Sequence, residues 1–118
     1  MKKRILVVED EDKLRRVIEL QLTSSGFDVD KAANAEDALK IADRADMVLT
    51  DLKLPNMDGL QLLGHIRAHD EWRHVPVIMI TTEGAAAKVQ EAVALGATGY
   101  VRKPFTAEQI KEKLNGLL

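Results

Sequence analysis

The sequence predicts an α/β protein built on a parallel five-stranded sheet, and two observations support this fold class. Short apolar runs that are typical of strands alternate five times with longer stretches of helical periodicity. Three of these runs, at residues 5–8, 47–50 and 77–81, are almost wholly apolar, as expected for strands that helices cover on both faces. We therefore expect a three-layer sandwich, formed by a single domain that spans residues 1–118.

The first third of the chain contains two strands and one helix. After the strand at residues 5–8, apolar side chains form one stripe of a helix over about residues 12–24. Gly26 follows directly, where glycine commonly ends a helix. Residues 27–30 then alternate between apolar and polar types, which predicts a half-exposed strand at one edge of the sheet.

The middle third begins with a capping signal. Asn34 is placed to cap a helix over about residues 35–44, with Asp37 in its first turn. The central strand at residues 47–50 follows. A third helix is expected to begin at Asp58 or a neighbouring residue, because apolar side chains recur at helical spacing beyond it.

The last third repeats this alternation after the strand at residues 77–81. An alanine-rich pattern predicts a helix over about residues 84–95, with Gly96 as its stop signal. Residues 99–103 include polar members and suit the opposite edge of the sheet. Thr106 and Gln109 have the spacing of a capping box, which predicts the start of the final helix.

The composition excludes several classes of function. The net charge of −2 gives no general attraction to nucleic acid or to an anionic membrane. The absence of cysteine excludes disulfides, zinc–thiolate sites and thiol catalysis. The apolar stretch near the start is too short for a signal peptide, so we expect a cytoplasmic protein. The Arg15–Arg16 pair is expected to be solvated.

Polar side chains suited to phosphate chemistry follow four of the predicted strands. The four strand ends carry, in chain order, Glu9 with Asp10, then Asp51, Thr81 and Lys103. Because parallel strands share one edge at their carboxyl ends, we expect these groups to meet in one crevice. The sequence therefore predicts a site with three carboxylates, a hydroxyl and an ammonium.

Such a crevice can support phosphoryl transfer to a carboxylate. Asp51 would act as the nucleophile and form an aspartyl phosphate. Mg²⁺ would offset the repulsion between the two anions, since it prefers oxygen ligands and needs only one or two carboxylates. Thr81 and Lys103 would stabilise the phosphoryl oxygens, and no separate general base is required.

The order and spacing of the motifs closely resemble those of response-regulator receiver domains, the CheY-like proteins of two-component signalling. The resemblance covers essentially the whole chain. It rests on Val7-Val8-Glu9-Asp10-Glu11, Thr50-Asp51-Leu52-Lys53-Leu54-Pro55-Asn56-Met57-Asp58-Gly59-Leu60, Ile78-Met79-Ile80-Thr81-Thr82 and Gly96-Ala97-Thr98-Gly99-Tyr100-Val101-Arg102-Lys103-Pro104-Phe105. It implies a flavodoxin-like fold with strand order 2-1-3-4-5.

The resemblance also implies roles for individual residues. Asp51 becomes the phosphoacceptor, while Thr81 and Lys103 bind the phosphoryl oxygens. Mg²⁺ is expected to be held by the carboxylates of Asp10 and Asp51, by the carboxylate of Glu9 through water, and by the backbone carbonyl of Lys53. A cis peptide is expected at Lys103–Pro104, and Gly59 is expected to supply backbone freedom at the end of the loop after Asp51.

Two further sets of residues are implicated in switching and in access to the site. The resemblance implies that Thr81 and Tyr100 form a switch, which alters the surface of the fourth helix, fifth strand and fifth helix. Lys53 and Glu83 are predicted to flank the mouth of the site with opposite charges, and the size of Thr82 is expected to control access.

The expected function is that of a switch that catalyses its own phosphorylation and dephosphorylation, and not that of an enzyme with turnover. Its partners would be a sensor histidine kinase or phosphotransfer protein and an unidentified target or output domain. One alternative is a phosphate-independent scaffold. Another is a haloacid dehalogenase-type phosphatase, but such enzymes need a second aspartate where this chain has Lys53. A flavin carrier would need a hydroxyl- and glycine-rich loop after the first strand, where this chain has acids.

Overall fold

A computed structural model of the chain describes residues 3–81, 86–102 and 105–117. Within these ranges, the side chains of residues 81, 86–89, 107 and 114–117 are not described. The elements follow one another as β1 (Arg4–Val8), α1 (Asp12–Ser24), β2 (Asp28–Ala32), α2 (Ala35–Ile41), the 3₁₀ helix η1 (Ala42–Arg44), β3 (Met47–Asp51), α3 (Gly59–Ala68), β4 (Val77–Thr81), α4 (Ala86–Ala94), β5 (Gly99–Arg102) and α5 (Ala107–Leu117).

The strands form one parallel sheet in the order β2-β1-β3-β4-β5, which confirms the predicted fold class and strand order. The chain starts near the centre of the sheet, adds β2 on one side, and then crosses over to add β3, β4 and β5 on the other. This reversal lies between β1 and β3, and their carboxyl ends are where ligands bind in open α/β sheets.

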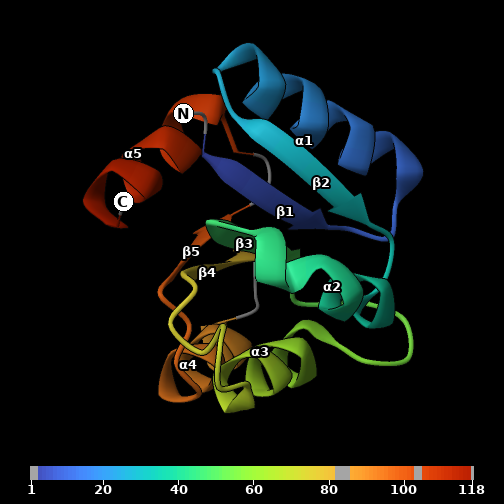
Figure 1. The fold of residues 1–118 in the computed structure, drawn as a ribbon, viewed down its shortest axis with the longest axis vertical. Helices are drawn as coiled ribbons and strands as arrows, with labels where there is room; N and C mark the ends of the chain where they lie inside the picture. Colours follow the sequence, from blue (N-terminus) through green and yellow to red (C-terminus); the bar gives the residue numbers. More distant parts are fainter. Residues whose placement is uncertain (1–2, 82–85, 103–104, 118) are drawn as a thin grey trace.

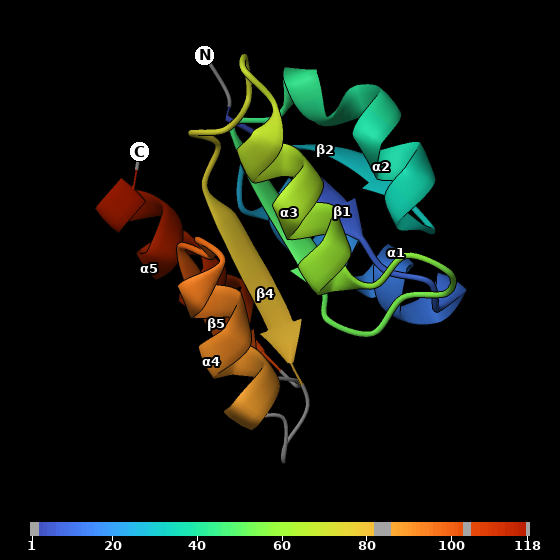
Figure 2. The same cartoon turned by 90° about the horizontal axis from the view of Figure 1, so that it is seen from below.

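Helices cover both faces of the sheet, as the apolar central strands require. Figure 1 shows α1 and α5 on one face and α2, α3 and α4 on the other, and Figure 2 shows the latter three helices from below. Two apolar cores fill the space between the layers. Val8 and Met79 belong to the core beneath α2, α3 and α4, whereas Leu49 and Ile80 belong to the core beneath α1 and α5.

The predicted helix signals are present as hydrogen bonds. The Asn34 side chain accepts a hydrogen bond of 2.8 Å from the backbone N–H of Asp37. Thr106 and Gln109 form a reciprocal capping box, in which each backbone N–H donates to the other side chain. Gly26 adopts a φ of 97°, the left-handed conformation that ends a helix.

Several element boundaries differ from the sequence prediction by one to three residues, and two of these differences have a visible structural cause. The edge strand β2 spans Asp28–Ala32 and not residues 27–30, because the backbone N–H of Phe27 donates to Leu22 at the end of α1. The second helix is shorter than predicted: α2 ends at Ile41, and the tighter turn of η1 continues to Arg44.

Among the residues that the structure describes, none of the helices has the length and apolar character needed to cross a bilayer.

Candidate functional site

The register between β1 and β3 brings two predicted acids to the same level of the sheet. Val8 of β1 pairs with Thr50 of β3. The residues that follow this pair are Glu9 and Asp51, so the two acids lie side by side at the carboxyl ends of these strands. Both acids are nearly inaccessible to solvent, with 1% of Glu9 and 8% of Asp51 exposed. Charged side chains are seldom buried to this extent without a partner of opposite charge.

Asp10 adds a third carboxylate on the solvent side of this pair. One carboxylate oxygen from each of Glu9, Asp10 and Asp51 lies within 4.8 Å of the other two, and Asp10 is exposed. The three therefore form an acidic pocket that is closed on the protein side and open toward water. Its donor set suits a hard divalent cation that accepts few carboxylates and keeps water ligands.

The loop after β3 folds back to hold Asp51. The backbone N–H of Lys53 donates to Oδ1 of Asp51 at 3.2 Å, and the N–H of Gly59 donates to the carbonyl of Leu52 at 2.9 Å. The turn between them depends on Asn56, which has a φ of 67°. Hydrogen bonds from the backbone thus fix both the Asp51 side chain and the start of α3.

Gly59 was expected to supply backbone freedom after the loop, and this expectation is wrong. Gly59 is the first residue of α3, and its φ is not in the left-handed region. Glycine is required there because a Cβ would overlap the carbonyl oxygen of Asp51 and approach the Cα of Leu52 to 2.9 Å. The unusual backbone conformation belongs to Asn56, and the Pro55-Asn56 turn signal in the sequence could have identified it.

The remaining predicted site residues are described only in part. Lys53 is exposed beside Asp51, and Thr81 ends β4 opposite Arg102, with only its backbone described. Thr82, Glu83, Lys103 and the Lys103–Pro104 peptide lie outside the described residues. Tyr100 pairs with Met79 in the sheet and is 44% exposed.

The sequence pattern that defines the family "Response regulator receiver domain" matches residues 5–115. The chain belongs to this family. The receiver is 41% identical to the chemotaxis protein CheY-3 of Vibrio cholerae over 116 residues, which cover 95% of this chain and 88% of the relative. It is 37% identical to the CheY homolog of Campylobacter jejuni, with 98% of this chain and 92% of the relative covered.

Solved structures of receivers have the same arrangement. The CheY4 response regulator of Vibrio cholerae aligns with a TM-score of 0.89 and 32% identity over the full length of both chains. The receiver domain of the sensor histidine kinase PA1611 of Pseudomonas aeruginosa aligns with a TM-score of 0.89 and 31% identity, covering 99% of this chain and 98% of its own. That structure has a magnesium ion coordinated in its active-site cleft. This receiver is thus of the CheY type, a family whose general function is to be phosphorylated by kinases in two-component signalling.

One residue beside the acidic pocket of this receiver makes a contact that sequence reasoning missed. Arg15 is not solvated as expected, since 20% of its side chain is exposed and its guanidinium donates to the carbonyl of Glu9 at 2.9 Å. Arg16, the next residue, is exposed as predicted. Any backbone carbonyl can accept such a bond, so no sequence motif marks the contact.

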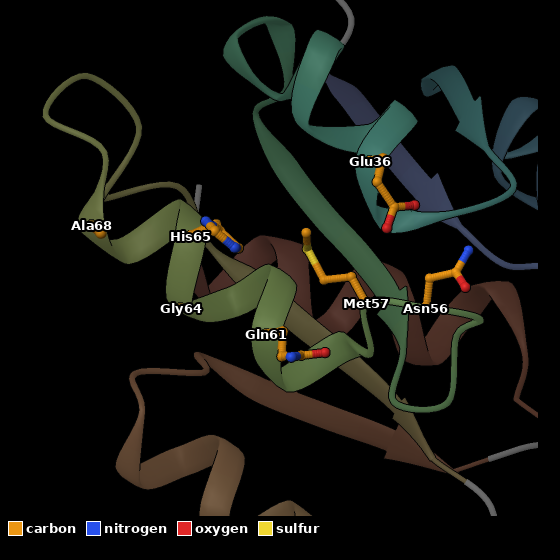
Figure 3. A pocket seen from close by; sticks show the side chains of 7 residues that line it. All are labelled: Glu36, Asn56, Met57, Gln61, Gly64, His65 and Ala68. Carbon is orange, nitrogen blue, oxygen red and sulfur yellow. The ribbon is translucent and has the colours of Figure 1, made fainter.

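A separate groove of about 650 Å³ lies between α2 and α3 of the receiver (Figure 3). It is lined by Glu36, Asn56, Met57, Gln61, Gly64, His65 and Ala68. None of the three pocket acids contributes to this lining, so the groove is distinct from the acidic pocket. The loop between β3 and α3 contributes to both, since Asn56 and Met57 line the groove and the N–H of Lys53 donates to Asp51.

Trp72 lies beyond the end of α3 that is remote from Asp51. Its ring stacks on His69, with 3.7 Å between the ring centroids, and it packs against the core beneath α2, α3 and α4. Trp72 therefore covers this end of the helix. The position also makes Trp72 a poor reporter of events at Asp51, so experiments on the site need another readout.

Proposed function

We propose that Asp51 of this receiver accepts a phosphoryl group from a histidine kinase or a phosphotransfer protein, in a Mg²⁺-dependent reaction. The observation that carries the proposal is the convergence of Glu9 and Asp10 on a nearly buried Asp51 at the end of a central strand. The proposed Mg²⁺ ligands are these three carboxylates and the backbone carbonyl of Lys53. When bound, Mg²⁺ would neutralise charge as the two anions approach.

The reaction at Asp51 is a displacement on phosphorus. A carboxylate oxygen forms a bond to phosphorus while the bond between phosphorus and the donor's imidazole nitrogen breaks, and the imidazole takes up a proton. Oδ1 of Asp51 is held by the backbone N–H of Lys53, which orients the nucleophile. Thr81 and Lys103 are proposed to stabilise the transferred oxygens. The exposed Lys53 argues against the phosphatase alternative, which needs an acid at that position.

Phosphorylation is further proposed to act through Thr81 and Tyr100. Tyr100 is 44% exposed on β5, so it is able to lose solvent contact by moving inward. That movement would change the surface formed by α4, β5 and α5, to which a protein target or output domain would bind. As in the sequence prediction, we propose a cytoplasmic location with no direct nucleic-acid or membrane partner.

The direct test is covalent labelling with acetyl phosphate. We expect the wild-type protein to gain one phosphoryl group in the presence of Mg²⁺, as measured by intact mass. Asp51→Asn should gain none, because an amide cannot form the acyl phosphate, and omission of Mg²⁺ should prevent labelling of the wild type. Equal labelling of wild type and Asp51→Asn would contradict the assignment of the acceptor.

A second prediction concerns the lifetime of the phosphorylated form. Lys53 and Glu83 are proposed to slow entry of the hydrolytic water, so Lys53→Asn and Glu83→Ala should each lose the phosphoryl group faster. The expected increase is small, roughly fivefold or less, because exposed ion pairs contribute at most about 1 kcal/mol.

The measurement is the rate of phosphoryl loss after removal of the donor. Lys40→Asn is a suitable control, since Lys40 is 75% exposed on α2 and the variant has the same charge change. Unchanged or slower loss in both variants at the site would rule out the proposed gate.

A further inference from the structure

The turn between β1 and α1 carries two of the three pocket acids but lacks the usual helix cap. Glu11 occupies the N-cap position of α1, and its side chain makes no capping hydrogen bond. Instead, the backbone N–H of Glu11 donates to Oε2 of Glu9 at 3.2 Å. The carboxylate of a pocket acid thus accepts the hydrogen bond at the turn. The start of α1 therefore lacks the support that a side-chain cap normally gives, which is typically worth about 1 kcal/mol.

Arg15 supplies that support from the second turn of α1. Its guanidinium donates to the carbonyl of Glu9 at 2.9 Å and to Oδ1 of Asp12 at 2.6 Å. It therefore bridges the end of β1 and the start of α1, and only 20% of its side chain is exposed. By contrast, Asp12 is 88% exposed, so the buried part of this contact is the one to Glu9.

The backbone of Glu9 is consequently held on both sides. Its N–H donates to the carbonyl of Ala32 at 3.1 Å, and its carbonyl accepts from Arg15. The side chain that projects from this fixed backbone is 1% exposed and faces Asp51. Asp10 follows immediately and takes its position from the same turn.

We propose that Arg15 is a positioning residue for the acidic pocket, which sets Mg²⁺ affinity by fixing the backbone of Glu9. The inference rests on the proposed function, because it concerns the metal on which that function depends. Partners that orient metal ligands from outside the coordination sphere commonly have large effects on affinity. In this receiver the orienting residue is Arg15, whose positive charge allows a positioning effect on Mg²⁺ affinity to be distinguished from a charge effect.

Two effects of Arg15 on Mg²⁺ affinity have opposite signs. A positive charge beside the acids repels a cation, so by charge alone its removal would tighten Mg²⁺ binding. If Arg15 acts by positioning, its removal weakens binding despite the more negative pocket. Lysine separates the two effects, since it keeps the charge and the aliphatic stem but lacks the planar fork that bridges two acceptors.

The experiment compares Arg15→Lys, Arg15→Gln and Arg16→Gln with the wild type. Mg²⁺ affinity is measured by titration of backbone amide chemical shifts, and thermal melting by circular dichroism verifies that each variant is folded at the titration temperature. Both Arg15 variants should bind Mg²⁺ roughly tenfold more weakly. Arg16→Gln removes the same charge from an exposed neighbour and should bind as the wild type does.

The possible outcomes separate this inference from the proposed function. Wild-type affinity in Arg15→Lys, or tighter binding in Arg15→Gln, overturns the positioning role and leaves the proposed function standing. Equal weakening in Arg16→Gln also overturns it, because Arg16 makes no bridge to Glu9 and the loss of affinity would then not depend on that bridge. Failure of the wild-type protein to bind Mg²⁺ overturns both.

Discussion

A single methyl group at Gly59 is expected to destabilise this receiver by about 2–3 kcal/mol. The Cβ of Gly59→Ala would overlap the carbonyl oxygen of Asp51, and it would lie 2.9 Å from the Cα of Leu52 and 3.1 Å from the Cε of Met79. Two of these three neighbours are backbone atoms at the end of a central strand, so they cannot turn aside as a side chain can.

The size of the effect follows from two opposing contributions. Alanine in a helix is favoured over glycine by up to about 1 kcal/mol. Overpacking typically costs about 1–3 kcal/mol and occasionally more, and contact with immobile backbone atoms places Gly59→Ala at or above the upper end of this range. The cost exceeds the gain, and the displaced Asp51 backbone should also lower Mg²⁺ affinity.

Gly64, in the middle of the same helix, is a matched control. A Cβ at Gly64 meets no atom within 4 Å, so Gly64→Ala should be stabilising by about 0.5–1 kcal/mol. The measurement is the free energy of unfolding from urea denaturation of both variants. If the two alanine variants changed stability equally, the proposed crowding beneath Asp51 would be wrong.

The sequence was sufficient for the features that depend on local patterns. Apolar runs located the central strands, and side-chain chemistry located the caps at Asn34 and Thr106. Because residues at the carboxyl ends of neighbouring parallel strands lie close together, the convergence of Glu9 and Asp51 also followed from the predicted topology.

The features that were missed depend on contacts with the backbone of a neighbouring element or loop. The crowding at Gly59 requires that the start of α3 passes against the end of β3, which no local pattern specifies. The bonds of Arg15 and Arg67 end on main-chain carbonyls, and every residue has one. Arginine at these positions therefore looks like any surface arginine until the tertiary structure supplies its acceptors.

Arg67 carries the second large effect, because its guanidinium joins three segments. It donates to the carbonyls of Gly96 at 2.9 Å and Val75 at 2.6 Å, with further bonds to the carbonyl of Arg73 and to Oγ1 of Thr98. The bond to Gly96 places a cation at the carboxyl end of α4, where it is favourable. Burial lowers the pKa of Arg67, but arginine keeps its proton in proteins.

Replacing Arg67 with methionine is expected to cost about 2–4 kcal/mol of stability and to lower the melting temperature by roughly 10 °C. The apolar stem is retained, so the loss reports on the hydrogen bonds. The carbonyl of Val75 is part-buried and loses its charged donor, whereas the acceptors at the surface can turn to water.

Two further variants test whether the lost stability comes from the hydrogen bonds of the guanidinium. Arg67→Lys should lose most of the same stability, since an ammonium cannot reach the acceptors before β4 and those after α4 at once. Arg73→Met makes the same substitution on an exposed side chain nearby and should change stability by less than about 0.5 kcal/mol. Full stability in Arg67→Lys would show that charge alone holds α4 against the rest of the fold, and the geometry of the guanidinium would then be incidental.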